Sequence, residues 1–573
     1  MKTVNNIRIT SIIIIIILFS VIAACVYPPY ERQGCSHERV EDVLPNGYYH
    51  YSLGVLFALG GEIDRAIGEY KSALRFDPES SYLMNELAML YIKKGEMNTA
   101  ISLLEESVTC DPEYVDSHIL LGSLYDNLEE YEAAINEYKK VVEIDPEKLE
   151  AYLFLGLLYR ENKDYNSAID VLSHLLRIDP CNLMGSYYLA KIYVAVERYD
   201  ETETWLHKTL DIKPAFRPAL LDLGLLYRSQ GKGERAVETY MDFLQNNPTD
   251  IKIRFELGKT LLKLKRYDAA AEEFEKILKL DNSLADVHFS LGLAYFFGGE
   301  EYDRAIGEFF TVLESRPDNY RAIYFLAGAY EKKEQYTDAM KELETIPEES
   351  GLYTTARIRM GFILKKEGHA GKAIELIRKE VEKSSKDLEF YRFLTALYEE
   401  ENRLGDAEDV LKKALSFSPQ DIDLHYKLGV MYGKENKHQE SVRAMKAVLK
   451  LDPGNANAIN FIGYSYAERG IRLDEAEKLI KKALRLKPDS GYIMDSLGWV
   501  YFKQNRVKLA IDYLKKAWDL LPEEPVIAGH LGDAYKKDGQ IEKALKVYKR
   551  ALDFNPGNND LKEKIRNIRV PSE

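Results

Sequence analysis

An internal period of 34 residues constrains this chain more than any other feature. Residues 115–146 and 149–180 superimpose at a shift of 34 residues, and both end in Asp-Pro. Proline recurs at nearly the same interval along the chain, at Pro78, Pro112, Pro146, Pro180, Pro214, Pro248, Pro317, Pro419, Pro453, Pro488, Pro522 and Pro556. Such a repeat predicts a stack of similar units, each of which needs its neighbours to bury a core.

Each period also carries two small residues about twelve positions apart, such as Gly122 and Ala134. Leu121 and Tyr125 lie one helical turn apart, so they share a helix face. The small residues allow two helices to approach closely, and Asp-Pro ends the second helix because proline cannot continue one. We count fifteen helix–turn–helix units between residues 47 and 556.

This pattern resembles the tetratricopeptide repeat (TPR) family. The resemblance implies an all-α fold, an α-solenoid that forms a right-handed superhelix of about fifteen 34-residue units over residues 47–556. Residues 557–573 are expected to form a C-terminal capping helix and tail. Units nine to eleven depart most from the pattern: Pro347 comes early and Thr395 takes a position that glycine usually occupies.

The first 24 residues read as a leader. Lys2 and Arg8 precede the almost wholly apolar residues 9–24, which are long for a signal-peptide core and short for a membrane-crossing helix. Residues 22–25 (IAAC) resemble the lipobox of bacterial lipoproteins, which implies cleavage before Cys25 and lipidation of its thiol. An ordinary cleaved signal peptide and a retained signal anchor are the alternatives. The lipobox predicts a lipid anchor in the bacterial cell envelope, and Val26, where aspartate would retain the protein at the inner membrane, favours the outer membrane facing the periplasm.

Residues 25–46 are expected to form a flexible spacer between the lipid and the solenoid. The remaining cysteines are Cys35, Cys110 and Cys181. Cys110 and Cys181 end the second and fourth units, which places them about 20 Å apart if each unit advances by about one helix diameter. A disulfide needs Cα atoms within about 7 Å. We therefore predict no bond between them.

Composition and motifs exclude several classes of function. The net charge of −15 argues against nucleic acid as a partner. The charge is uneven, because residues 81–148 hold 15 acidic and 5 basic residues whereas 354–387 hold 9 basic and 5 acidic residues. The ten histidines are scattered, and His118, His425 and His530 are interpreted as helix-packing residues. Without a catalytic, phosphate-binding or metal-binding motif, we expect no enzyme activity, no cofactor and no metal.

In the TPR family the second, fifth, ninth and twelfth positions of each first helix line the concave groove. Applied here, the resemblance predicts a peptide groove lined by Tyr48, Tyr51, Tyr82, Asn85, Met89, Tyr187, Phe289, Phe296, Tyr324, Asn457, Asn460, Tyr464, Tyr492, Trp499 and Phe502. Many of these side chains could instead pack against the next helix. The basic residues of the carboxylate clamp known in this family are missing around Asn85, because Tyr51 and Asp116 stand in their place.

The prediction for function is a membrane-anchored scaffold that binds protein or peptide partners in its concave groove, during cell-envelope assembly, secretion or surface-polymer export. Aromatic side chains at the groove positions favour this hypothesis, since aromatic anchors carry much of the energy of interfaces. The alternative is a structural spacer or surface adhesion protein that uses its convex face. The oligomeric state does not follow from the sequence.

Overall fold

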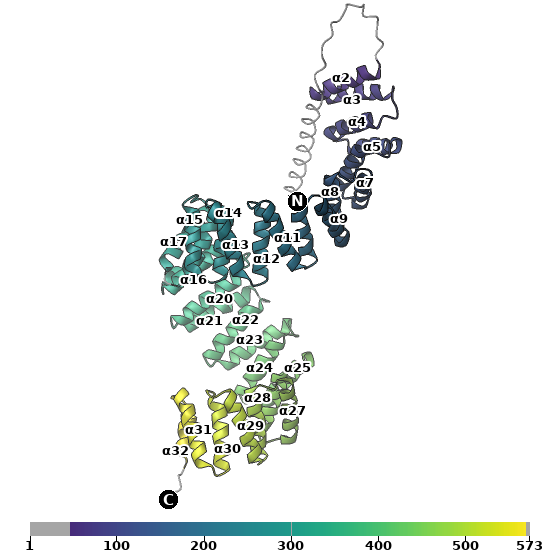
Figure 1. Cartoon of the computed structure of the whole chain (residues 1–573). Coiled ribbons are helices and arrows are strands. Elements are labelled where there is room, and N and C mark those ends of the chain that lie inside the picture. The colour runs from purple at the N-terminus through teal and green to yellow at the C-terminus, as the bar shows by residue number, and fades with distance from the viewer. Residues whose placement is uncertain (1–45, 300, 385, 569–573) are drawn as a thin grey trace, which may run out of the picture. The chain divides into compact units, whose positions relative to one another are not determined.

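The computed structural model describes residues 46–299, 301–384 and 386–568. Within these ranges it contains 31 helices, labelled as in Figure 1, and no strand. The predicted all-α solenoid is thereby confirmed. The predicted signal peptide, Cys25, Cys35 and all but the last residue of the spacer lie outside the described residues.

The described helices fall into two compact units, residues 1–226 and 227–573. The sequence period alone does not predict this division. The helices of the first unit are α2 (Gly47–Leu59), α3 (Ile63–Leu74), α4 (Ser81–Lys94), α5 (Met97–Cys110), α6 (Val115–Asn127), α7 (Tyr131–Ile144), α8 (Leu149–Glu161), α9 (Tyr165–Ile178), α10 (Leu183–Ala195), α11 (Tyr199–Ile212) and most of α12 (Arg217–Ser229).

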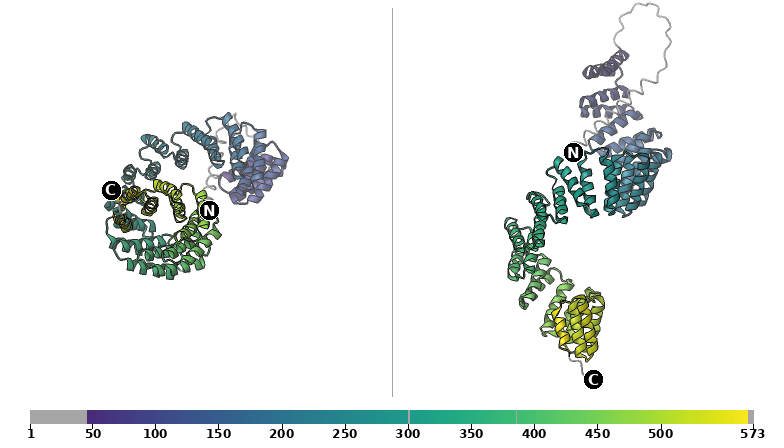
Figure 2. Two further views of the ribbon diagram at one scale, coloured as in Figure 1. Left: turned by 90° about the horizontal axis from the view of Figure 1, so that it is seen from below. Right: turned by 90° about the vertical axis from the view of Figure 1, so that its left-hand side faces the viewer.

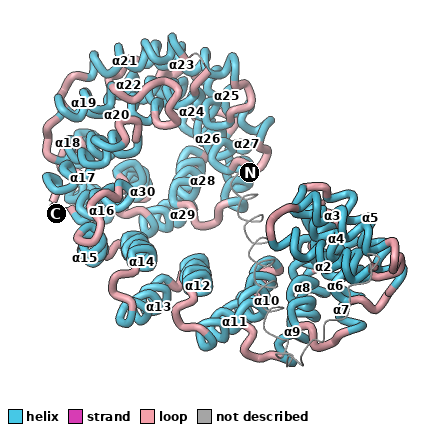
Figure 3. Tube along the Cα trace, turned by 90° about the horizontal axis from the view of Figure 1, so that it is seen from above, coloured by secondary structure: helices cyan, strands magenta, loops and turns pink. Residues whose placement is uncertain are grey.

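The second unit holds the remaining helices, of which α20 to α27 are the easiest to follow in Figure 3. They are α13 (Gly233–Asn246), α14 (Ile251–Lys263), α15 (Tyr267–Leu278), α16 (Ala285–Gly298), α17 (Tyr302–Ser315), α18 (Tyr320–Lys332), α19 (Tyr336–Glu344), α20 (Tyr353–Lys366), α21 (Ala370–Lys383), α22 (Leu388–Glu400), α23 (Leu404–Phe417), α24 (Ile422–Lys434), α25 (His438–Leu451), α26 (Ala456–Glu468), α27 (Leu473–Leu486), α28 (Gly491–Lys503), α29 (Val507–Leu520), α30 (Pro525–Lys537), α31 (Ile541–Phe554) and α32 (Asn559–Arg566).

Helices α2 to α31 follow one another as fifteen consecutive pairs; the two helices of each pair other than α12 and α13 pack together, and α32 packs against α31. Within residues 227–573 successive pairs stack on one another (Figure 2). Even-numbered helices are the first helices of the pairs and odd-numbered helices the second. None of the described helices combines the length and the apolar character that crossing a membrane would require.

The small residues hold the two helices of a pair together. A Cβ atom added at Gly122 would lie 2.8 Å from Cε2 of Tyr138 on the facing helix. Ala134 on that second helix is fully buried. Larger side chains at these positions would push the helices apart, which explains why the pattern repeats.

The Asp-Pro pairs end the second helices as predicted. Helix α7 stops at Ile144, and Asp145 then leaves the helical conformation, with φ of −127° and ψ of 89°. The backbone N–H of Glu147 donates to Oδ1 of Asp145 at 3.1 Å, which closes the turn after the proline. The aspartate therefore contributes its side chain to the loop, while the proline stops the helix.

Each first helix is followed by a residue in the left-handed backbone conformation. In all fifteen pairs a residue with positive φ lies between the two helices. Seven of these residues are glycines, and Glu334 and Asn505 are two of the exceptions, with φ of 59° and 63°. This conformation closes the first helix and turns the chain into the second.

Candidate functional site: the inner wall of the first helices

The first helices line the inner side of the curved stack in the second unit. Figure 3 shows α20, α22, α24 and α26 on the inside of the curve, with α19, α21, α23, α25 and α27 outside. Because the small eighth position of a first helix faces its own second helix, the second, fifth, ninth and twelfth positions lie on another face. We call the surface formed by these four positions of the first helices the inner wall.

The structure gives the fifteen predicted groove residues different degrees of exposure. Tyr48, Tyr82, Asn457 and Tyr492 are exposed. The half-buried ones are Tyr51, Met89, Tyr187, Phe289, Phe296, Tyr324, Asn460, Tyr464, Trp499 and Phe502. Asn85 is buried.

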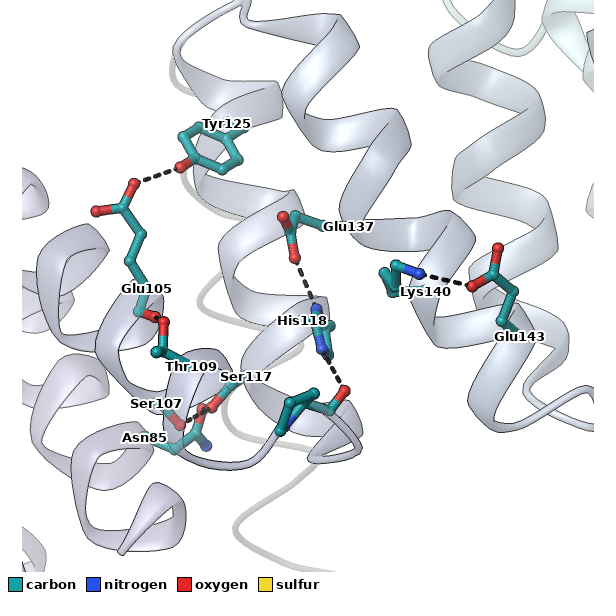
Figure 4. A network of polar contacts seen from close by, with 11 residues as sticks. Asn85, Glu105, Ser107, Thr109, Ser117, His118, Tyr125, Glu137, Lys140 and Glu143 are labelled. Carbon is teal, nitrogen blue, oxygen red and sulfur yellow. Dashed lines mark hydrogen bonds and ion pairs between the residues drawn. The ribbon is translucent and has the colours of Figure 1, made fainter. Parts of the chain in front are cut away.

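Asn85 requires a correction, because its side chain is not on the surface. The hydroxyl of Ser117 on α6 donates to Oδ1 of Asn85 on α4 at 3.2 Å, and the hydroxyls of Ser107 and Ser117 lie 2.8 Å apart. Figure 4 shows the three side chains together between neighbouring helices. The small serines leave room for the amide to turn inward. The sequence could not reveal this, because Ser107 and Ser117 lie far from Asn85 in the chain. Asn85 therefore links α4 to α6 through Ser117.

Three of the remaining groove residues of the first unit, Tyr51, Tyr82 and Tyr187, form hydrogen bonds across neighbouring first helices. The hydroxyls of Tyr51 and Tyr82 are 2.9 Å apart. Tyr187 and Lys191 on α10 both donate to Oδ2 of Asp222, at 2.9 Å and 3.0 Å. Part of this polar surface is thus already engaged within the protein.

In the second unit, Phe289 and Phe296 of α16 form an aromatic cluster with Phe325 of α18. The ring centroids of Phe289 and Phe296 lie 6.1 Å and 5.6 Å from that of Phe325. Each of these rings is half-buried. The cluster joins consecutive first helices and leaves only part of its aromatic surface to a partner.

A pocket of about 600 Å³ opens between α18 and α20. We call it the α18–α20 pocket; it is lined by Tyr324, Glu331, Thr355, Ile358, Arg359, Phe362, Lys365 and Lys366. Of these only Tyr324 is among the predicted site residues. Thr355, Ile358, Phe362 and Lys365 hold the second, fifth, ninth and twelfth positions of the tenth unit. The position rule, together with the basic excess of residues 354–387, could have identified them.

Three first helices near the C-terminus contribute a second set of residues, which we call the C-terminal cluster: Asn460, Tyr464, Asp495, Trp499, Phe502 and His530. Nδ1 of His530 lies 2.9 Å from Oδ1 of Asp495, and both side chains are buried. The Trp499 ring stacks on His530 with a centroid distance of 4.0 Å, and on Phe502 at 4.8 Å. Burial raises the pKa of Tyr464 well above its ordinary value. The cluster is packed mainly against itself.

Histidines elsewhere in the described chain serve the packing of helices. Nδ1 of His118 lies 2.7 Å from a carboxylate oxygen of Glu137, and Nε2 lies 3.0 Å from the carbonyl oxygen of Pro112 (Figure 4). The hydrogen bond with Glu137 raises the pKa of His118, against the lowering effect of burial. His425 contacts the carbonyl oxygen of Pro419 at 2.9 Å. These contacts agree with the interpretation of the histidines as structural residues.

The thiols of Cys110 and Cys181 are free and exposed, which confirms that they do not form a disulfide. Across the described ranges no three histidine, cysteine or carboxylate side chains come together as metal ligands would. The chemistry of the inner wall is that of aromatic, amide and charged groups, which can bind a partner.

Comparison with known proteins identifies the same repeat. Models described as tetratricopeptide repeat match residues 81–114, 115–148, 221–285, 297–352, 426–491, 472–525 and 501–568. A model of the anaphase-promoting complex, cyclosome, subunit 3 matches residues 138–209.

Two curated relatives match short segments only. A TPR repeat-containing protein of Pseudomonas aeruginosa is 45% identical over 60 residues, which is 10% of each chain. The human protein O-mannosyl-transferase TMTC3 is 32% identical over 98 residues, covering 17% of this chain and 11% of the relative. The matches thus span about a tenth of the length of these relatives.

Solved structures that resemble this one include Naa15/Naa10 bound to HypK-THB, at 15% identity, with 92% of this chain and 98% of that chain covered and a TM-score of 0.33. Yeast Tom70 is 16% identical, with 73% and 93% covered and a TM-score of 0.34. MamA is 25% identical, with 28% and 95% covered and a TM-score of 0.27. The family models, the 34-residue period and the packed helix pairs agree, and this chain belongs to the tetratricopeptide repeat family.

Proposed function

We propose that this protein is a lipid-anchored scaffold that binds protein or peptide partners along the inner wall. Its repeats suit protein–protein interaction, as TPR folds commonly bind protein or peptide partners. The lipid on Cys25 would attach it to the bacterial cell envelope, on the periplasmic side of the outer membrane. There it would serve envelope assembly, secretion or surface-polymer export.

One observation carries the binding proposal. Aromatic side chains at inner-wall positions stay uncovered by the described residues: Tyr48 is 84% exposed, Tyr492 57% and Phe362 51%. Large exposed aromatics at the same positions of successive first helices are typical of binding surfaces, because burying such side chains supplies much of the energy of an interface.

The structure also decides which residues should be altered in a test. Trp499 and Phe289 pack against other rings, so replacing them would disturb the wall itself. Tyr82 and Tyr492 are exposed, and each hydroxyl has one hydrogen-bond partner, Tyr51 or Glu524, so replacing them should disturb the wall less. They are therefore better probes of binding.

The test is photo-cross-linking of the full-length protein in the cells that produce it. A photoreactive amino acid would replace Tyr82 or Tyr492 on the inner wall, and Lys372 or Phe310 on second helices as matched outer positions. We expect a few defined envelope proteins to be captured from the inner positions only. Equal capture from inner and outer positions would contradict groove binding and favour a spacer or adhesion protein.

The lipid anchor needs a separate experiment. Cells would be fed a labelled fatty acid, and the wild-type protein compared with Cys25→Ser. We expect label and membrane attachment in the wild type and neither in the variant. If the Cys25→Ser protein still fractionates with the membrane, the anchor is something other than a lipid on this thiol.

A further inference from the structure

The α18–α20 pocket differs from the rest of the inner wall in its volume and its charge. Its volume of about 600 Å³ lies within the range of about 300–1,000 Å³ typical of ligand sites. Arg359, Lys365 and Lys366 contribute three positive charges to its lining, and Glu331 one negative charge. The protein as a whole carries a net charge of −15, so this local excess stands against the general charge.

Arg359 is held in one orientation by its neighbours. Its Nε donates to Glu331 at 2.8 Å, and its guanidinium carbon lies 4.7 Å from the ring centroid of Tyr324. The absence of a side chain at Gly328 makes room for it, since a Cβ there would lie 2.8 Å from Nη2. No hydrogen bond from Nη2 to another described residue accompanies these contacts. A guanidinium that is already oriented, with N–H groups to spare, suits a carboxylate.

The two lysines differ in how far they are engaged. Lys365 forms an ion pair with Glu400 of α22 at 2.6 Å. Lys366 is exposed, and its ammonium lies 5.3 Å from the ring centroid of Tyr336. Lys366 is therefore the cation that a ligand can approach without breaking an ion pair of the protein.

An apolar surface lies beside these cations. The side chain of Phe362 is 51% exposed, although one side of its ring packs on Phe393 at a centroid distance of 4.5 Å. Ile358 and Tyr324 are half-buried and complete the lining. The pocket thus offers apolar contact and positive charge side by side.

We propose that the α18–α20 pocket binds an acidic segment of a partner protein in which a carboxylate side chain lies next to an apolar one. The carboxylate would meet Arg359 and Lys366, and the apolar side chain would cover Phe362 and Ile358. This proposal rests on the proposed function and names the chemistry of one partner site. Charge complementarity favours it, because an acidic segment is repelled by most of this chain and attracted here.

The test is selection of binding peptides from a random dodecapeptide display library on the full-length protein. The selection would be repeated on the double variant Phe362→Ala/Lys366→Glu. The matched control is Phe310→Ala/Lys372→Glu, which makes the same two changes at exposed positions of second helices. The best peptide would then be synthesised with a fluorophore and titrated by anisotropy.

We expect the wild type and the control to enrich peptides with aspartate or glutamate beside an apolar residue. The double variant should bind the synthetic peptide at least tenfold more weakly, and so should the wild type when glutamine replaces the acidic residues of the peptide. Circular dichroism of the variants checks that the helices are intact.

Three results would overturn the proposal: no enriched peptide, enriched peptides without carboxylates, or equal enrichment by the double variant. A dimer of the protein that Lys366→Glu dissociates would do so as well, since the occupant would then be a second copy. If the inner positions Tyr82 and Tyr492 still capture partners in cells while the pocket fails, only this inference falls. Scattered cross-links together with acidic peptides bound in the pocket would instead contradict the wider groove function.

Discussion

The α18–α20 pocket and the C-terminal cluster occupy equivalent positions in different repeats, yet one is open and the other is filled. In the cluster, Trp499 lies against His530 and Phe502, and a buried carboxylate bonds the histidine. In the pocket, Phe362 stays half exposed and the charged groups line a space of about 600 Å³. The same face of the first helices can therefore either join neighbouring repeats or form a binding site.

Helix α19, which connects α18 to α20, suggests why the pocket is open. Helix α19 has 9 residues, whereas α17 and α21 have 14 each. Pro347 follows soon after, and a residue that precedes proline avoids the helical conformation. Helix α26 packs closely along α28, whereas α18 and α20 pack less closely and are bridged by Arg359, which donates to Glu331 and to the carbonyl oxygen of Tyr324. The break in the repeat and the pocket thus occur together.

The largest expected effect is a difference in free energy of unfolding between a variant of the C-terminal cluster and a variant of the pocket. Trp499→Ala should cost about 3 kcal/mol, since it removes a ring stacked on two others. Phe362→Ala should cost less than about 1 kcal/mol, because much of its ring is already in water. Urea unfolding measures the totals, and hydrogen exchange of α28 and α20 shows where the loss occurs, since repeats open locally.

Phe393→Ala is the matched control for Phe362→Ala. The two rings touch, but Phe393 is only 9% exposed, so its removal should cost about 3 kcal/mol or more. If Phe362→Ala and Phe393→Ala destabilise equally, Phe362 is a packing residue. The distinction between an open and a filled wall would then be wrong.

A smaller effect is expected from the buried acid of the C-terminal cluster. Asp495→Ala leaves the ring nitrogen of His530 without its partner in a buried place, which should cost about 2 kcal/mol. Asp495→Asn should cost less because its carboxamide oxygen can still accept a hydrogen bond. The exposed Asp489→Ala serves as the control and should change stability by no more than about 0.5 kcal/mol. Thermal unfolding followed by circular dichroism can rank the three variants, and equal losses would contradict a structural role for Asp495.

In the α18–α20 pocket, the loss of an acidic residue should change stability less than it does in the C-terminal cluster. Glu331→Gln removes the only negative charge of the lining, and its ion pair with Arg359 is partly exposed, so stability should fall by at most about 1 kcal/mol. Affinity for the selected acidic peptide should rise about threefold, since a repulsive charge is gone. Anisotropy titration measures this, with the exposed Glu367→Gln as control. Weaker binding by Glu331→Gln would mean that Glu331 matters chiefly by orienting Arg359.

The fold followed from the sequence because its determinants are local. The small eighth position, the buried alanine and the Asp-Pro turn act within one unit of 34 residues, and repetition makes them visible. The residues of the candidate site could be predicted from the sequence only in part. Asn85 turns inward because Ser117 on a neighbouring helix donates to it, and Trp499 is engaged because His530 comes from the next repeat. Such contacts depend on residues that lie far apart in the chain.

The α18–α20 pocket illustrates the opposite case. Thr355, Ile358, Phe362 and Lys365 could have been found by the position rule, but they lack the row of aromatics that identified other units. Their importance depends on the space beside a shortened helix, which no single position specifies. A break in the repeat, such as the early Pro347, is therefore a signal worth following for a site.

The smallest expected effect concerns the turns that end the first helices of the two regions. Glu334 follows α18 and Asn505 follows α28, both with positive φ. A glutamate in this conformation costs about 1–2 kcal/mol, whereas asparagine tolerates it better. Glu334→Gly should therefore stabilise the protein by about 0.5–1 kcal/mol after the entropic cost of glycine, while Asn505→Gly should be nearly neutral. Urea unfolding of both variants measures this, with Lys333→Gly as a control that should destabilise because Lys333 has negative φ. Equal stabilisation by Glu334→Gly and Asn505→Gly would show that the two turns carry the same strain, so that the difference between the regions lies in the helix faces alone.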